Sequence, residues 1–196
     1  MKKTLLHRRE SLILTAIDII NELGIQGLSI REVAKRQGIS AASLFGHFKS
    51  KNELIHAVLD HFTLYDNVIM QSIELKSLHS KKAIVYYIDS FYTYYENYPA
   101  ITAILLAYDT LRCEPDFSER MKDILLLRSS SLIKMITEAQ NTGEIRSDIG
   151  AESIADMILG SCAVICLKWR TEKYKFPLKS RVLNTLDAIL DSFTPK

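Results

Sequence analysis

The sequence predicts an all-α fold, and three observations support this class. Apolar residues recur three or four positions apart through nearly every segment of the 196 residues. Glycine and proline are scarce, with seven and four copies, and alternating β-branched runs are few. Capping signals and isolated glycines mark where helices begin and end. These features predict about nine helices, with a three-helix headpiece at the N-terminus and a larger helical domain behind it.

The first helix is expected from about Leu5 to Leu23, and Gly24 ends it. The cations that precede or open this helix are Lys2, Lys3, Arg8 and Arg9. Two interpretations of these cations remain open, a solvated tail or a basic arm that touches the DNA backbone or the minor groove. The helix itself is expected to support the headpiece.

Two short helices joined by a tight turn are predicted within residues 29–48, SIREVAKRQGISAASLFGHF. Ser29 and Glu32 form a capping box at the first helix start. Gly38 supplies the left-handed turn that ends this helix. The layout is typical of a helix-turn-helix, in which the second helix lies in the major groove of DNA.

The second of these helices carries little side-chain bulk. Ser40 caps its start, and we expect Leu44, Phe45 and Phe48 to anchor it in the core. Its other residues are small or polar, so the helix can approach another backbone closely. In a helix-turn-helix, the N-terminal residues of such a helix meet the base edges.

Ser50 and Glu53 form another capping box, and Lys51 lies in the first turn of the helix that follows. Arg31 holds the equivalent place in the earlier helix. Free backbone donors and a cation at a helix start suit a phosphate group. A solvated surface charge is the alternative interpretation for each of these cations.

The segments RESLILTAIDIINELG, LSIREVAKRQGIS and SLFGHFKSKNELIHAVL follow one another with characteristic spacing. Over residues 9–60 they resemble the DNA-binding domain of the TetR family of bacterial repressors. Phe45 departs from the family, which usually has a tyrosine there whose hydroxyl touches a DNA phosphate. Either Phe45 packs, or the phosphate contact passes to His47, Ser43 or Lys51.

These observations define a candidate DNA interface. Ser29, Arg31 and Lys51 are expected to hold the phosphate backbone. A methyl group such as that of Ala42 can touch a thymine methyl, and hydroxyl or imidazole groups can bond bases. The candidate DNA-binding residues are Ser29, Arg31, Ala42, Ser43, Phe45, His47 and Lys51.

Charge is distributed unevenly along the chain. Residues 1–60 hold nine lysines and arginines against six acidic residues, whereas the remainder holds 16 against 17. A basic N-terminal part is typical of a nucleic-acid binder, although this asymmetry is modest. Three cysteines without a spaced framework indicate a reducing compartment, and no secretion signal or membrane span is evident. We therefore expect a cytoplasmic protein.

The chain is expected to divide into a DNA-binding domain, residues 1–50, and an effector-binding and dimerisation domain, residues 51–196. One long helix from Lys51 to about Ile73 is expected to link them. It contains no glycine or proline, so we expect a rigid connector.

Six of the nine tyrosines fall within residues 83–98, mostly at helical spacing. Ordinary core is one interpretation, with hydroxyls that reach the surface. The wall of an apolar ligand cavity is the other. A helix from Ile101 to Leu111 would supply a second wall. The candidate effector-binding residues are Tyr87, Phe91, Tyr94, Tyr98, Leu105, Tyr108 and Trp169.

The last two helices are expected at residues 151–170 and 178–193. Residues 157–167 are apolar on nearly all sides, so this helix requires partners on two faces. Pairing with the same two helices of a second subunit is one solution, and the family resemblance implies it. Burial within one subunit is the alternative.

The sequence lacks the Gly-rich phosphate loop, G-x-S-x-G and H-E-x-x-H motifs of common enzyme classes. Cys162 and Cys166 are four apart, but their setting is apolar and favours a core role over metal binding. We expect no enzyme activity, metal or cofactor. The predicted function is a homodimeric repressor that a small apolar or amphipathic effector releases from a palindromic operator. A helical ligand carrier or enzyme without sequence-specific DNA binding is the alternative.

Overall fold

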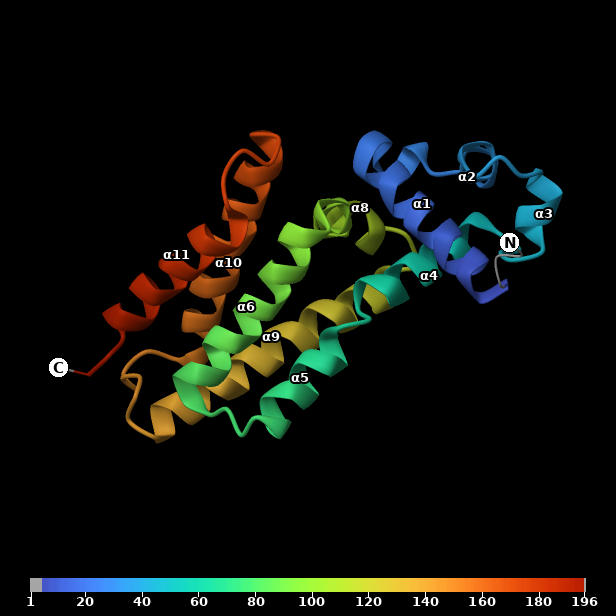
Figure 1. Cartoon of the computed structure of the whole chain (residues 1–196). Helices are drawn as coiled ribbons and strands as arrows, with labels where there is room; N and C mark the ends of the chain where they lie inside the picture. Colours follow the sequence, from blue (N-terminus) through green and yellow to red (C-terminus); the bar gives the residue numbers. More distant parts are fainter. Residues whose placement is uncertain (1–4, 196) are drawn as a thin grey trace. The chain divides into compact units, whose positions relative to one another are not determined.

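The computed structural model describes residues 5–195, and its regular structure is entirely helical over that range (Figure 1). Lys2 and Lys3 lie outside the described residues. Packing divides the chain into two units. The headpiece unit runs to Leu64 and adds residues 98–122, and the body unit comprises residues 65–97 and 123–196.

Helix α1 lies at the centre of the contacts in the headpiece unit and packs against α2, α4, η1 and α7. Its elements are α1 (Leu5–Gly27), α2 (Ile30–Arg36), α3 (Ala41–Phe45), α4 (Lys51–Phe62), the 3₁₀ turn η1 (Pro99–Thr102), α7 (Ala103–Leu106), α8 (Tyr108–Arg112) and the start of α9 (Ser118–Asn141). Gly24, at φ 70° and ψ 175°, interrupts α1 where the sequence predicts its end.

The body unit is a set of packed longer helices. Its elements are α5 (Asp66–Leu75), α6 (Ser80–Asn97), the greater part of α9, α10 (Ala151–Thr171) and α11 (Leu178–Ser192). Helix α6 packs against α5 and α11, and α11 packs against α10. The observed bounds of α10 and α11 lie within one residue of the expected ones.

The predicted single connector helix from Lys51 to Ile73 is wrong, because α4 ends at Phe62 and α5 begins at Asp66. The Thr63 hydroxyl donates to the carbonyl oxygens of Leu59 and Asp60 at 3.2 Å each. The break thus falls at residues 63–65, which contain no glycine or proline.

The expected helix over residues 101–111 is also divided, into η1, α7 and α8. Pro99 begins η1, a position that suits proline because its missing N–H would have no partner within the helix. Because each of these two predicted helices is divided, the described residues form more helices than the nine or so that the sequence predicts. Within residues 5–195, no helix combines the length and apolarity needed to cross a bilayer.

Candidate DNA-binding and effector sites

Two capped helices build the helix-turn-helix. The Ser29 hydroxyl oxygen accepts from the Glu32 backbone N–H at 3.1 Å, and the Ser40 oxygen accepts from the Ser43 N–H at 3.1 Å. Gly38 adopts φ 63° and ends α2 in the left-handed turn that the sequence predicts. The local start and stop signals therefore place α2 and α3 as expected.

An ion-pair network fixes α2 to α1. The Glu32 carboxylate accepts from Arg36 Nε at 3.0 Å, in place of the return bond expected for a capping box. Arg36 Nη2 also lies 2.8 Å from the Glu22 carboxylate on α1. The two carboxylates raise the pKa of Arg36, so its guanidinium stays charged in this network.

Helix α3 is anchored by two residues rather than three. Leu44 and Phe48 are fully buried, and the Arg9 guanidinium lies 4.7 Å from the centroid of the Phe48 ring. Phe45 is 50% exposed, so its prediction as a core anchor is wrong. It follows Leu44 directly, and one helical step turns its side chain about 100° away from the core. Sequence reasoning missed this orientation because all three residues are apolar.

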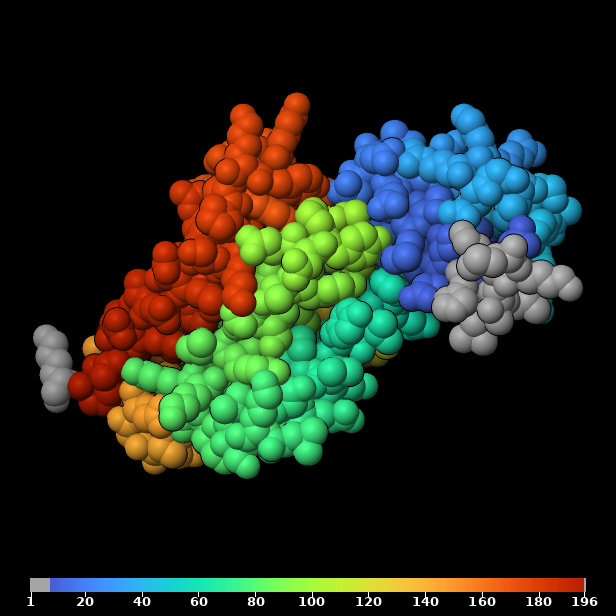
Figure 2. All heavy atoms as spheres, in the orientation of Figure 1, coloured from blue at the N-terminus to red at the C-terminus, as the bar shows by residue number. Residues whose placement is uncertain are grey.

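The remaining candidates on α3 are accessible. Ala42 and Ser43 are exposed, and His47 is half-buried just beyond the helix. Figure 2 shows α3, in light blue, at the surface of the headpiece unit. The helix therefore presents small side chains and one aromatic ring for contact with a partner.

The cations at the helix starts differ in their surroundings. Lys51 is half-buried, and its Nζ donates to the Ile25 carbonyl oxygen at 3.2 Å. An ammonium group has three donors, so two remain for a phosphate. Ser29 and Arg31 are exposed at the start of α2. The structure thus brings the whole predicted DNA-binding set into the headpiece unit, while the role of each residue stays a prediction.

The predicted effector-binding residues divide between the two units. Tyr87, Phe91, Tyr94 and Trp169 belong to the body unit, and Tyr98, Leu105 and Tyr108 belong to the headpiece unit. Trp169 is buried against Tyr174, with ring centroids 4.6 Å apart. The effector role of these residues stays a prediction.

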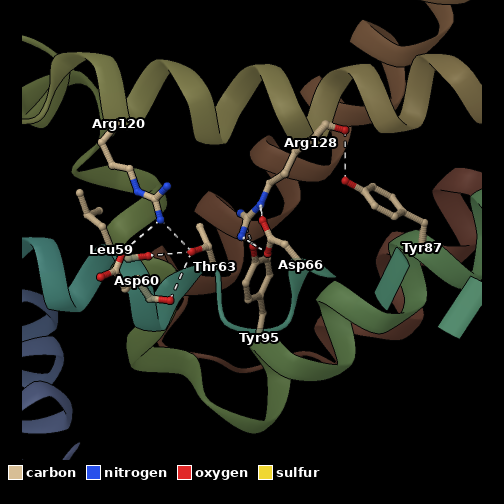
Figure 3. Close-up of polar contacts among 8 residues, drawn as sticks. All are labelled: Leu59, Asp60, Thr63, Asp66, Tyr87, Tyr95, Arg120 and Arg128. Carbon is tan, nitrogen blue, oxygen red and sulfur yellow. Dashed lines mark hydrogen bonds and ion pairs between the residues drawn. The ribbon is translucent and has the colours of Figure 1, made fainter. Parts of the chain in front are cut away.

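The body unit contains a buried polar network that the sequence did not predict (Figure 3). Arg128 on α9 donates from Nε and Nη2 to the two carboxylate oxygens of Asp66, both at 2.8 Å. These side chains are only 12% and 10% exposed. Arg128 Nη1 also donates to the Tyr95 hydroxyl at 3.1 Å, and the guanidinium lies 4.7 Å from the Phe91 ring centroid. The pair is therefore bidentate, enclosed and supported by two aromatic residues.

Burial and charge oppose each other in this network. Burial lowers the pKa of Arg128, but Tyr95 and Asp66 raise this pKa by more than burial lowers it. The pKa of Arg128 therefore lies above its usual value. Burial raises the pKa of Tyr87, whose hydroxyl donates to the Arg128 carbonyl oxygen at 3.1 Å. The only local pattern in the sequence is the position of Arg128 between three leucines and three serines. Its partner on another helix carried no comparable signal.

Two hollows lie beside this network. A cavity of about 30 Å³ is lined by Asp66, Arg128, Tyr87 and other residues. A groove of about 800 Å³ runs between α5 and α9, with Met70 and Ser131 lining both hollows. The buried ion pair is thus adjacent to an open groove of small-molecule size.

Helix α10 has two distinct faces. Cys162 and Cys166 are buried on one face, and burial raises the pKa of the Cys162 thiol to about 11. Met157, Val164 and Leu167 are about half exposed on the opposite face. Among residues 5–195, no cluster of three or more histidine, cysteine or carboxylate side chains is placed to hold a metal ion.

Residues 12–58 match the family described as "Bacterial regulatory proteins, tetR family". The class C tetracycline repressor of Escherichia coli is 38% identical over 53 residues, which are 27% of this chain and 24% of the repressor. The match therefore spans about a quarter of the length of that relative. The transcriptional repressor DhaR of Mycobacterium sp. strain GP1 is 23% identical across 94% of this chain and 93% of its own.

Solved structures share the fold over nearly the whole chain. The ketosteroid regulator KstR2 of Mycobacterium tuberculosis has a TM-score of 0.83 and 19% identity, covering 96% of each chain. FadR from Bacillus subtilis, in complex with stearoyl-CoA, has a TM-score of 0.76 and 16% identity, covering 94% of this chain and 97% of its own. A regulator from Saccharomonospora viridis, in complex with choline, has a TM-score of 0.78 and 18% identity, covering 97% and 100%.

A helical fold that begins with a helix-turn-helix headpiece defines a class of transcriptional regulators. The N-terminal residues are identified more narrowly. Residues 12–58 match the TetR family of bacterial regulatory proteins, and the chain as a whole shares the fold of solved regulators.

Proposed function

We propose that this protein is a homodimeric repressor that a small effector releases from a palindromic DNA operator. The observation that carries the proposal is the capped helix-turn-helix, in which Leu44 and Phe48 fix α3 while its small residues remain exposed. The family match over residues 12–58 supports DNA as the partner. As a regulator acting on the bacterial chromosome, the protein would work in the cytoplasm and need no enzyme activity.

The proposed DNA interface uses two kinds of contact. Ala42, Ser43 and His47 face the bases, through a methyl contact to thymine or hydrogen bonds to base edges. Phe45 stands beside them as an exposed ring and contributes apolar contact. This contact replaces the phosphate hydrogen bond of the tyrosine usual in the family.

Phosphate contacts hold the headpiece in register. The exposed Arg31 and the remaining donors of Lys51 lie at the starts of α2 and α4, where backbone N–H groups also favour an anion. The Ser29 hydroxyl adds a donor there. Neutralised phosphates release counterions, so affinity falls as salt concentration rises.

The exposed apolar face of α10 supports a dimer. Met157, Val164 and Leu167 are spaced seven and three residues apart, which places them along one stripe. An isologous pair of such faces buries the stripe about a two-fold axis. Two headpieces then reach successive major grooves about 34–36 Å apart, which requires an operator that is an inverted repeat.

The effector is proposed to bind in the body unit, in the groove between α5 and α9. Two solved proteins with this fold are in complex with chemically different ligands, FadR with stearoyl-CoA and the Saccharomonospora viridis regulator with choline. The fold alone therefore does not specify the effector. Effector and operator must weaken each other's binding by the same factor, because coupling between binding sites is reciprocal.

Selection from random duplex oligonucleotides at moderate ionic strength, followed by footprinting, tests the proposal. We expect one discrete palindromic site with protection on two successive major grooves. Smeared protection would indicate a nucleoid-type binder. Complete lack of sequence preference would favour the helical ligand carrier or enzyme instead, and reporter output would separate repression from activation.

A further inference from the structure

We propose that Arg128 recognises an anionic group of the effector, and that this group takes the place of Asp66 on the guanidinium. The inference rests on the proposed function and narrows it, since it names the effector as a small amphipathic anion. An anionic head would occupy the ion-pair site, and an apolar tail would lie in the groove between α5 and α9.

Arg128 is the fixed partner of the pair. It projects from the middle of α9, a helix of 24 residues, where it bonds Asp66 and the Tyr95 hydroxyl (Figure 3). The Phe91 ring also lies against its guanidinium. Two of these three supports remain when the carboxylate leaves. The guanidinium therefore stays oriented, with its fork available to another carboxylate or phosphate.

Asp66 is the replaceable partner. It is the first residue of α5, directly after the break at residues 63–65. An acidic side chain at a helix start is stabilised by the backbone N–H groups there, so the released carboxylate retains favourable surroundings. Exchange of one carboxylate for another also leaves no buried guanidinium unpaired, which would otherwise be costly.

The cavity beside the ion pair and the groove are separate hollows that share two lining residues. The cavity of about 30 Å³ beside the ion pair has room for about one water molecule, so it marks a gap rather than a complete pocket. Met70 lies one turn after Asp66 on α5, and Ser131 lies one turn after Arg128 on α9. Both residues also line the groove of about 800 Å³. Methionine is flexible, so displacement of Met70 would join the two hollows.

The groove itself carries charges of both signs. Glu74 and Glu138 carry two negative charges against the one positive charge of Lys134, and His79, 2.9 Å from Glu138, is charged only when protonated. These groups do not favour an anionic ligand along the groove. The preference for an anion therefore rests on Arg128, which makes the inference specific to one residue.

Calorimetric titration of the full chain with three probes of equal tail length tests the inference. The probes are decanoate, 1-decanol and decyltrimethylammonium, in the absence of DNA. We expect decanoate to bind about tenfold more tightly than decanol, the gain typical of one charge-assisted hydrogen-bonded pair. Decyltrimethylammonium is expected to bind no better than decanol.

Two variants separate recognition from a structural role. Asp66→Asn removes the competing carboxylate and is expected to tighten decanoate binding several-fold, which loss of structure would not do. The double variant D66N/R128Q keeps an amide pair of similar volume and is expected to bind decanoate and decanol equally. Thermal melting confirms that each variant is folded.

Asp60→Asn is the matched control. Asp60 also pairs with an arginine of α9, Arg120, at 3.0 Å, but it is exposed in the headpiece unit (Figure 3). Its replacement is expected to leave decanoate affinity unchanged. The inference would be overturned by equal affinity for all three probes, by no binding, or by preference for the ammonium probe. Weaker decanoate binding by D66N would overturn it as well.

The operator selection is scored separately. A discrete operator together with failure of decanoate binding would overturn only the inference about Arg128. Decanoate binding that depends on Arg128, without any sequence preference for DNA, would overturn the repressor function instead.

Discussion

At the scale of single residues, Phe45 shows how two adjacent apolar side chains acquire different roles. Leu44 is fully buried and Phe45 is half exposed, because one step along α3 rotates the side chain out of the core. An exposed ring on a helix proposed to enter DNA is available for contact. The Phe45 ring should therefore contribute to the free energy of DNA binding rather than to the free energy of folding.

Phe45→Ala is expected to weaken operator binding while changing the free energy of unfolding by less than about 1 kcal/mol. Leu44→Ala, the internal comparison, removes a buried side chain and is expected to cost about 2–5 kcal/mol of stability. Chemical denaturation and fluorescence anisotropy with the selected operator measure the two effects. A loss of stability in F45A equal to that in L44A would contradict the proposed role.

Lys51→Ala is expected to reduce affinity for all DNA sequences similarly and to lower the slope of log affinity against log salt by about one. The reason is the loss of one phosphate contact at the start of α4. Lys122→Ala provides the control, since Lys122 is exposed and paired with Glu119 on α9. An unchanged salt slope for K51A would show that Lys51 does not contact phosphate.

At the scale of helices, polar side chains make contacts on both sides of the break between α4 and α5. The Thr63 hydroxyl bonds the last carbonyls of α4, and Arg120 Nη2 donates to Asp60 at 3.0 Å and to Thr63 at 3.4 Å. Asp66 opens α5 and is held to α9 by Arg128. The predicted connector is therefore two helices. Arg120 bonds Asp60 of α4, and Arg128 bonds Asp66 of α5.

The buried pair predicts an asymmetry in stability. Arg128→Gln leaves the Asp66 carboxylate buried without its cation and is expected to lower the free energy of unfolding by about 3–5 kcal/mol. The double variant D66N/R128Q removes both charges and is expected to recover most of this loss. Urea denaturation of the three proteins measures the difference. Equal losses in the single and double variants would mean that the charges do not act as a pair.

At the scale of the whole molecule, we expect a dimer because α10 has an exposed apolar stripe of Met157, Val164 and Leu167. Val164 lies at its middle, half exposed, whereas Cys162 two residues earlier is buried in the body unit. A monomer gains nothing from an apolar stripe in water, and a second copy of α10 would cover it.

Val164→Glu is expected to shift the protein from dimer to monomer, because it places two like charges near the two-fold axis of the proposed interface. Thr171→Glu, at another exposed position at the end of α10, serves as the control. Sedimentation at several protein concentrations measures the change. A wild-type protein that is monomeric at micromolar concentration would refute the interface directly.

Sequence alone determined the helical class, the caps at Ser29, Ser40 and Ser50, and the bounds of α10 and α11. These features depend on neighbours within one or two turns, so local spacing contains the information.

Only the tertiary structure decided that Phe45 faces outward, that the connector breaks after Phe62, and that Arg128 meets Asp66. Arg128 and Asp66 lie 62 residues apart in the chain. Such contacts arise from how helices pack on one another, and no periodicity within a single helix encodes them.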